Sequence, residues 1–186
     1  FKVNPDIAIF GKALGNGYAI NAIIGKKSIM ESANSTFISS TFWTERIGTV
    51  AALKTLETME EYKSWNVISK IGINIKNNWN NLANNNKVKI KVMGVDSLPN
   101  FIFLHKDHLY FKTYLTQEML KHKILAWNSI YVSISHNQKV LDRYYNILDK
   151  IFKDIKDCID QRKNIKFLLK SPVSIAGMRG TIKNFK

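Results

Sequence analysis

The stretch from Pro5 to Lys27 constrains the fold most, because it alternates short apolar runs with glycines. Its first run, Ile7–Phe10, has the length and β-branched content of a buried strand and stops at a glycine. Lys12 follows at once, and a second apolar run covers Ala19–Ile24. Ligands of open α/β sheets bind beyond the carboxyl ends of strands, so Lys12 stands where a reactive amine would be placed.

Two interpretations of Lys12 remain open on this pattern alone. A lysine held among apolar residues loses its charge more readily, which makes the amine nucleophilic. A lysine beside a glycine at a strand end is more commonly part of a solvated turn. The order of residues excludes a phosphate-binding P-loop, because Gly11-Lys12 precedes the other glycines instead of closing the run.

The segment resembles the cofactor-lysine region of the class III aminotransferases. The matching residues are Pro5-Asp6, Phe10-Gly11-Lys12-Ala13, Gly15-Asn16-Gly17-Tyr18 and Ala22-Ile23-Ile24-Gly25. These enzymes use pyridoxal 5'-phosphate (PLP) on fold type I and include glutamate-1-semialdehyde 2,1-aminomutase. The resemblance implies that Lys12 is the catalytic lysine and carries PLP as a Schiff base. One departure is Ala19, where the family usually has proline.

Hydroxyl side chains gather from Ser39 to Thr44, just before a helical pattern. Taken as residues, they predict helix capping, with Thr44 as the N-cap. The resemblance implies more for Thr41, which matches a family threonine that binds the cofactor phosphate of the neighbouring subunit; a homodimer follows. Trp43-Thr44-Glu45-Arg46 replaces the common Gly-Asn-Pro, which leaves transferase versus mutase chemistry open.

Two helices are predicted next. Residues 48–62 are rich in Ala and Leu and offer apolar side chains for burial, namely Ile47, Val50, Ala51 and Leu56. A second helix covers about 65–82 and ends at the polar turn 84–87.

From Lys87 the pattern changes to short strands and helices. Strands are predicted at 88–92, 99–104, 124–127 and 131–135, and a helix at about 111–121 with Leu115, Met119 and Leu120 inward. The last helix has the clearest pattern, an apolar stripe of Val140, Leu141, Tyr144, Leu148, Ile151, Phe152, Ile155 and Ile159.

With the resemblance, these elements predict an α/β chain of fold type I. It would comprise the end of the PLP-binding large domain (1–62), a connecting helix (63–86), the small carboxyl-terminal α/β domain (87–170) and a basic tail (171–186). Class III enzymes are more than twice as long, so the chain is interpreted as a carboxyl-terminal part, inactive without the upstream part that holds the glycine-rich phosphate loop.

Composition narrows the other possibilities. The net charge of +14 is spread over most segments and carried mainly by lysine, so nucleic-acid binding is not favoured. Apolar runs are too short for a membrane span, and a single cysteine, Cys158, fits a cytoplasmic setting. His105 and His108 lie in a turn without a third ligand nearby, so no metal site is predicted. His136 is expected to order the start of the last helix.

The sequence therefore predicts an aminotransferase that moves an amino group between a small amino donor and a carbonyl acceptor through Lys12. Three alternatives stay open: an aminomutase that transfers the group within one molecule, a non-catalytic fragment, and a basic nucleic-acid-binding domain.

Overall fold

The computed structural model describes residues 2–174, and the chain divides after Ser64 into two compact units. We call residues 2–64 unit 1 and residues 65–174 unit 2, and each is described by itself. The final part of the predicted basic tail, 175–186, lies outside the described residues.

Unit 1 is built on an antiparallel hairpin and one long helix. Its elements are β1 (Ile7–Phe10), η1 (Lys12–Leu14), β2 (Ala22–Gly25), α1 (Lys27–Met30), η2 (Glu31–Ser35) and α2 (Arg46–Tyr62). The hairpin register pairs Ile7 with Gly25 and Phe10 with Ala22. The expectation that β1 is a buried strand is wrong for the described chain, because three of its four residues are exposed.

The long helix of unit 1 differs from its prediction in the same way. Ile47, Val50 and Leu56 were expected inward, but each is more than half exposed. The only buried residues of α2 are Gly48 and Ala52. The apolar periodicity predicts which face of the helix should be buried, but no segment of unit 1 covers that face of α2.

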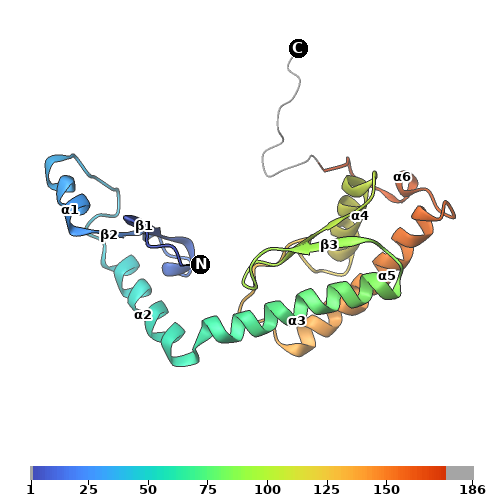
Figure 1. Cartoon of the computed structure of the whole chain (residues 1–186), viewed down its shortest axis with the longest axis horizontal. Coiled ribbons are helices and arrows are strands. Elements are labelled where there is room, and N and C mark those ends of the chain that lie inside the picture. Colours follow the sequence, from blue (N-terminus) through green and yellow to red (C-terminus); the bar gives the residue numbers. More distant parts are fainter. Residues whose placement is uncertain (1, 175–186) are drawn as a thin grey trace, which may run out of the picture. The chain divides into compact units, whose positions relative to one another are not determined.

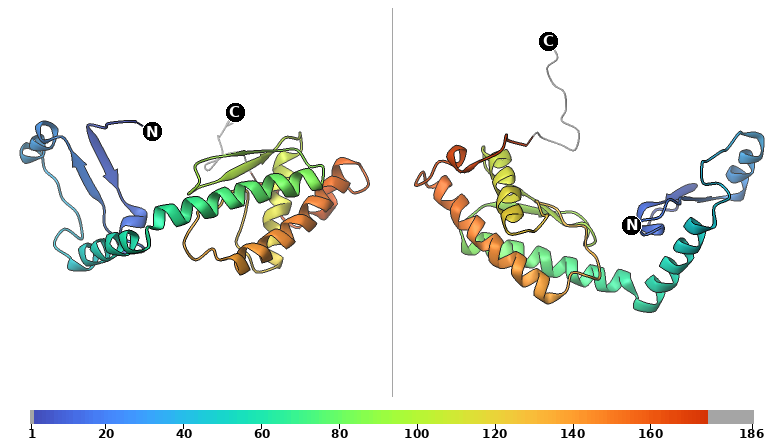
Figure 2. Two further views of the ribbon diagram at one scale, coloured as in Figure 1. Left: turned by 60° about the horizontal axis from the view of Figure 1, so that its bottom comes forward. Right: turned by 180° about the vertical axis from the view of Figure 1, so that it is seen from behind.

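Unit 2 contains the hydrophobic core. Its elements are α3 (Ser64–Asn85, whose first residue closes unit 1), β3 (Ile90–Met93), β4 (Asn100–Phe103), α4 (His108–Lys121), α5 (Gln138–Ile159) and α6 (Ile165–Leu168). Figures 1 and 2 show α3 and α5 side by side within this unit. The strands β3 and β4 pair antiparallel, with Ile90 opposite Phe103.

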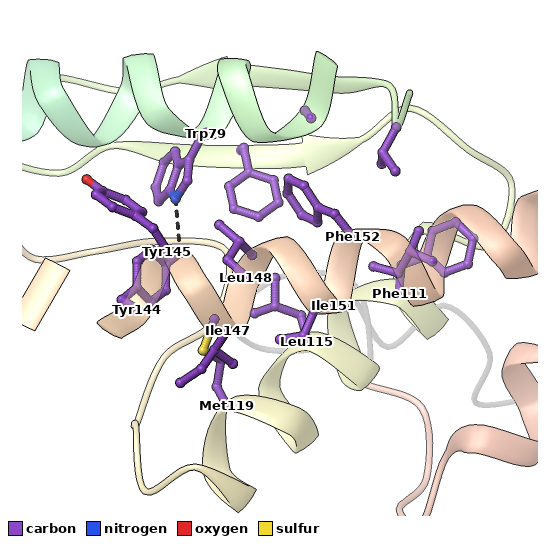
Figure 3. Close-up of a cluster of buried hydrophobic side chains, with 14 of the residues drawn as sticks. Trp79, Phe111, Leu115, Met119, Tyr144, Tyr145, Ile147, Leu148, Ile151 and Phe152 are labelled. Carbon is purple, nitrogen blue, oxygen red and sulfur yellow. Dashed lines mark hydrogen bonds between the residues drawn. The ribbon is translucent and has the colours of Figure 1, made fainter. Parts of the chain in front are cut away.

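Aromatic side chains fill the centre of that core. Phe101 on β4 is fully buried and meets Trp79 of α3 edge-on, with ring centroids 4.8 Å apart. Figure 3 shows Trp79, Phe152 and Leu148 together, with Leu115 and Met119 of α4 on the other side of α5. Such edge-to-face pairs are favoured beyond the burial of their area. Leu120, expected inward, is about half exposed instead.

The strands predicted at 124–127 and 131–135 do not form. The segment after Asn128 runs antiparallel to the one before β4, with Ile130 N–H donating to Pro99 O and Val132 N–H to Ser97 O. Phe101 N–H donates in the opposite direction, to Asn128 O at 3.0 Å, but Pro99 has no N–H to return the bond from Ile130, so only the isolated bridge of Asn100 with Ser129 results.

Candidate functional site

The loop after β1 presents Lys12 to the surface. Lys12 begins η1 with a φ of 50°, in the left-handed region that non-glycine residues seldom adopt. Its carbonyl accepts the Gly15 N–H at 3.2 Å, and Gly11 O accepts the Leu14 N–H at 3.1 Å. Six other non-glycine residues of the described chain have a similar φ, so this conformation belongs to the turn and does not by itself mark a site.

The Lys12 side chain is exposed, and its Nζ has no hydrogen-bond or ion-pair partner among residues 2–174. The neighbouring lysine of the hairpin behaves differently, because Lys26 Nζ lies 2.6 Å from a carboxylate oxygen of Asp6. The amine of Lys12 is therefore not committed to a structural contact. The apolar surroundings expected for it from the sequence are not formed within unit 1.

Two close approaches fix the segment that follows Lys12. A Cβ at Gly15 would lie 2.1 Å from the Tyr18 carbonyl oxygen, and one at Gly48 would lie 2.8 Å from the Ala19 carbonyl oxygen. The first contact requires glycine in the turn, and the second lets the start of α2 pack directly against the chain between the strands. Helix α2 thus supports the Lys12 loop.

Thr41 lies in the turn that leads into α2. It is exposed, and its hydroxyl has no hydrogen-bond partner in the described part of the chain. Glu45, not Thr44, is the N-cap residue of α2, and no side chain caps the helix. The prediction of Thr44 as the cap is wrong, because the turn that closes with Glu45 N–H bonded to Phe42 O shifts the helix start by one residue. No hydrogen bond joins Lys12 and Thr41.

A shallow hollow of about 370 Å³ opens beside the Lys12 loop. Its lining residues are Tyr18, Arg46, Ile47, Val50, Ala51 and Lys54. Arg46, Val50 and Lys54 recur every four residues and therefore share one face of α2. That spacing was the signal that could have indicated Lys54, which the sequence reasoning did not single out. Its lining thus combines two basic side chains, Arg46 and Lys54, with apolar ones.

His136 occupies a turn before α5 in unit 2. Its Nδ1 accepts the Ser133 N–H at 3.0 Å, and the next residue, Asn137, caps α5 by accepting the Val140 N–H at 3.1 Å. Burial lowers the pKa of His136 below its ordinary value of 6.5, which favours the neutral ring that accepts this bond.

A larger hollow in unit 2, of about 520 Å³, lies beside this turn. Its wall is mostly apolar and includes Leu125, Trp127, Tyr131, His136 and Tyr144. The sequence reasoning missed it, because it treated 124–127 and 131–135 as strands.

Other candidate groups do not form a second site. Within residues 2–174, no cluster of three His, Cys, Asp or Glu side chains could hold a metal ion. His105 Nδ1 instead accepts the Asp107 N–H at 3.1 Å. Burial raises the pKa of the Cys158 thiol, so this cysteine is kept in the unreactive protonated form. No helix in the described part of the chain is long and apolar enough to cross a membrane.

The model of one protein family, aminotransferase class-III, matches residues 1–99, which is more than half of the chain. The chain belongs to the class III aminotransferase family. The match includes the Lys12 loop, the Thr41 turn and both long helices that follow.

Two curated relatives agree with this assignment. The 3-aminobutyryl-CoA aminotransferase of Cloacimonas acidaminovorans (strain Evry) is 29% identical over 147 residues, covering 76% of this chain and 36% of the relative. The glutamate-1-semialdehyde 2,1-aminomutase of Methanocaldococcus jannaschii is 25% identical over 175 residues, covering 84% of this chain and 40% of that enzyme. The chain thus spans about two fifths of the length of these relatives.

The fold agrees as well. The FumI protein of Sphingopyxis sp. MTA144, solved in a PLP internal aldimine form, superposes with a TM-score of 0.77 at 19% identity. The superposition covers 90% of this chain and 41% of FumI. The α/β fold of the PLP-dependent transaminases, predicted from the sequence, is confirmed.

Proposed function

We propose that this chain carries the cofactor lysine of a PLP-dependent aminotransferase, which moves an amino group between a small amino compound and a carbonyl acceptor. Lys12 is the residue that holds PLP, through a Schiff base. The observation that carries the proposal is the family match over residues 1–99, which contains Lys12 with an amine free of structural contacts.

The residues present fit two ends of PLP. An uncommitted primary amine suits its aldehyde, which the amine can attack as a nucleophile. A hydroxyl such as that of Thr41 donates to phosphate oxygens. PLP, when bound, supplies the electron sink of the reaction. The chain's own part is to bind the cofactor and to move a proton.

Lys12 Nζ is the proton carrier in this proposal. A primary amine accepts a proton only in its neutral form, so its neighbourhood must disfavour the ammonium. The Lys12 side chain is exposed in unit 1. Activity therefore requires that an apolar surface cover the loop, which agrees with a chain that spans only two fifths of its relatives.

Thr41 serves the second subunit in this proposal. Its hydroxyl is exposed and makes no hydrogen bond within residues 2–174, which leaves it available to a phosphate bound by a partner copy. The protein would then act as a homodimer.

The aminomutase is the second candidate, because aminomutase relatives cover more of this chain than the aminotransferase does, 84% against 76%. The two reactions differ in their need for a second molecule. An aminotransferase needs an amino donor and a separate carbonyl acceptor, whereas an aminomutase converts glutamate-1-semialdehyde alone.

The test uses the protein expressed from the complete reading frame, incubated with PLP, reduced with borohydride and mapped by mass spectrometry. We expect one pyridoxyl adduct, on Lys12, which is lost in Lys12→Ala. The matched control is Lys27→Ala, which removes another exposed lysine of unit 1 and should keep the adduct. Adducts spread evenly over surface lysines, with Lys12 not preferred, would refute the assignment.

A further inference from the structure

Lys112 of α4 differs from the other half-buried lysines of this protein. In the described part of the chain, three lysines are neither exposed nor fully buried, namely Lys76, Lys112 and Lys156. Lys76 Nζ lies 2.9 Å from Asp96 Oδ1, and Lys156 Nζ lies 2.5 Å from Asp160 Oδ1. Lys112 Nζ has no carboxylate partner among the described residues. Charges that are removed from water are normally paired, so the ammonium of Lys112 lacks its counter-charge.

The contact that Lys112 does make is with an aromatic ring. Its Nζ lies 5.2 Å from the centroid of the Trp127 ring. The face of an aromatic ring attracts a cation, but it supplies no negative charge to neutralise the ammonium. Trp127 is 39% exposed, so the pair lies at the surface of unit 2, where a small molecule from solution can reach it.

Lys112 and Trp127 line a hollow of about 320 Å³ together with Asn100 and Ser129, and we call it the Lys112 hollow. Asn100 and Ser129 are opposite each other in the isolated antiparallel bridge, so their side chains lie on the same face. Neither the side-chain amide of Asn100 nor the hydroxyl of Ser129 makes a hydrogen bond within the described part of the chain. Three groups that can donate hydrogen bonds therefore line one hollow, and one of them is charged.

The larger hollow of unit 2 adjoins the Lys112 hollow. The two have a common wall, because Trp127, Ser129 and Tyr131 line both of them. The remaining wall of the larger hollow is mostly apolar and includes Leu125 and Val140. Its volume of about 520 Å³ is typical of pockets that bind small organic ligands. An apolar hollow and a hollow with an unpaired cation thus lie side by side.

The charge of the lining indicates which ligand fits. Of the described residues that line the two hollows, Lys112 alone is charged, and no Asp or Glu is among them. His136 lines the larger hollow, and its Nδ1 accepts the Ser133 N–H, which a ring can do only in its neutral form. One negative charge therefore balances the site, whereas a phosphate dianion would exceed it. A carboxylate carries that single charge and accepts hydrogen bonds at both oxygens.

We propose that the two hollows together bind a small organic monocarboxylate with an apolar body. Its carboxylate lies against Lys112, Asn100 and Ser129, and its apolar body fills the larger hollow against Trp127 and Leu125. A bound acid would join α4, the start of α5 and the segment between them. The site lies entirely within unit 2, so it depends neither on the cofactor lysine nor on the function proposed above.

The experiment is isothermal titration calorimetry of the full chain with three probes. Naphthylacetate carries a carboxylate and an apolar body, naphthylacetamide keeps the body without the charge, and acetate keeps the charge without the body. We expect naphthylacetate to bind at least about tenfold more tightly than either of the other two, because it alone engages both hollows. Lys12→Ala should bind naphthylacetate as tightly as the unchanged chain does, which separates this site from the function proposed for Lys12.

Matched substitutions test the role of Lys112. Lys112→Met keeps a long apolar side chain and removes the charge, so the affinity for naphthylacetate should fall about tenfold while that for naphthylacetamide changes little. Lys106→Met makes the same change at an exposed lysine that lines neither hollow, and it should leave both affinities unchanged. Leu125→Glu adds a negative charge at a 90% exposed position of the larger hollow, where the fold is not disturbed, and it should weaken naphthylacetate more than naphthylacetamide.

Each of four results would overturn the proposal. Absence of binding at millimolar naphthylacetate would show that the hollows hold no such acid. Equal affinities for naphthylacetate and naphthylacetamide would show that no cation recognises the ligand. Equal losses in Lys112→Met and Lys106→Met would show that the net positive charge of the chain attracts the acid without a specific site. An affinity for acetate as high as that for naphthylacetate would show that the larger hollow takes up no apolar body.

Discussion

The hydrogen bond between α3 and α5 offers the sharpest test of what holds unit 2 together. Trp79 Nε1–H donates to Tyr144 Oη at 2.9 Å, and the two side chains are 0% and 4% exposed. Tyr144→Phe removes the acceptor and keeps the ring, so the change leaves one buried N–H without a partner. Figure 3 shows the bond at one end of the buried cluster.

The expected cost follows from that burial. Leaving a buried donor without a partner costs the full free energy of its desolvation, about 1–3 kcal/mol. Tyr145→Phe is a matched control one residue away. Its hydroxyl donates to Asn74 Oδ1 at 3.0 Å, but Asn74 is exposed, so water can replace the lost donor and the cost should stay below about 1 kcal/mol.

The assay is equilibrium urea unfolding of the full chain, followed by far-ultraviolet circular dichroism. Tyr144→Phe should lower the free energy of unfolding of unit 2 by at least about 1 kcal/mol more than Tyr145→Phe does, with unchanged dependence on urea. In a double-mutant cycle, Trp79→Phe in the Tyr144→Phe background should cost less than it does alone. Equal costs for the two tyrosine variants would contradict the reasoning.

Two further predictions concern the same unit. Phe101→Ala empties a fully buried site beside Trp79, Phe103 and Phe152, and thermal unfolding should show a loss of stability of about 3–5 kcal/mol. The control is Phe167→Ala at an 86% exposed position, which should change stability by less than about 0.5 kcal/mol. Burial lowers the pKa of His136 in the folded state, so the unfolded chain binds the proton more readily. The resulting stabilisation of the folded state is complete above the ordinary pKa of 6.5. It is lost as the pH falls from 6.5 toward the pKa of the folded state. His136→Asn removes this group, so the decrease in urea midpoint between pH 7.5 and pH 5 should be smaller in the variant, and an unchanged decrease would show that other groups cause it.

Elements with one continuous apolar stripe were predictable from the sequence. The stripe from Leu141 to Ile155 recurs at helical spacing, and each of its members between these two residues is buried in α5. Such a stripe depends on residues that are close together in the chain, so the sequence shows it directly.

The predictions that were wrong depended on residues far apart. Residues 131–135 have strand-like composition, but the segment that pairs with Ile130 and Val132 contains Pro99, which has no N–H to return the bond from Ile130. Val50 and Leu56 were predicted to be buried because an apolar face was assumed to have its partner within the chain. A periodic apolar pattern shows that one face of a helix or strand is suited to burial, but it does not indicate which segment buries that face.

The loop around Lys12 illustrates the same difference between nearby and distant contacts. Gly11, Lys12 and Gly15 form a local turn whose geometry follows from hydrogen bonds over three or four residues, so the loop forms as the sequence predicts. The proposed reactivity of the Lys12 amine depends instead on removing water from it, and the side chain is exposed in unit 1. Residues close in sequence therefore set the turn around Lys12, whereas the surroundings of its side chain depend on residues that no local pattern identifies.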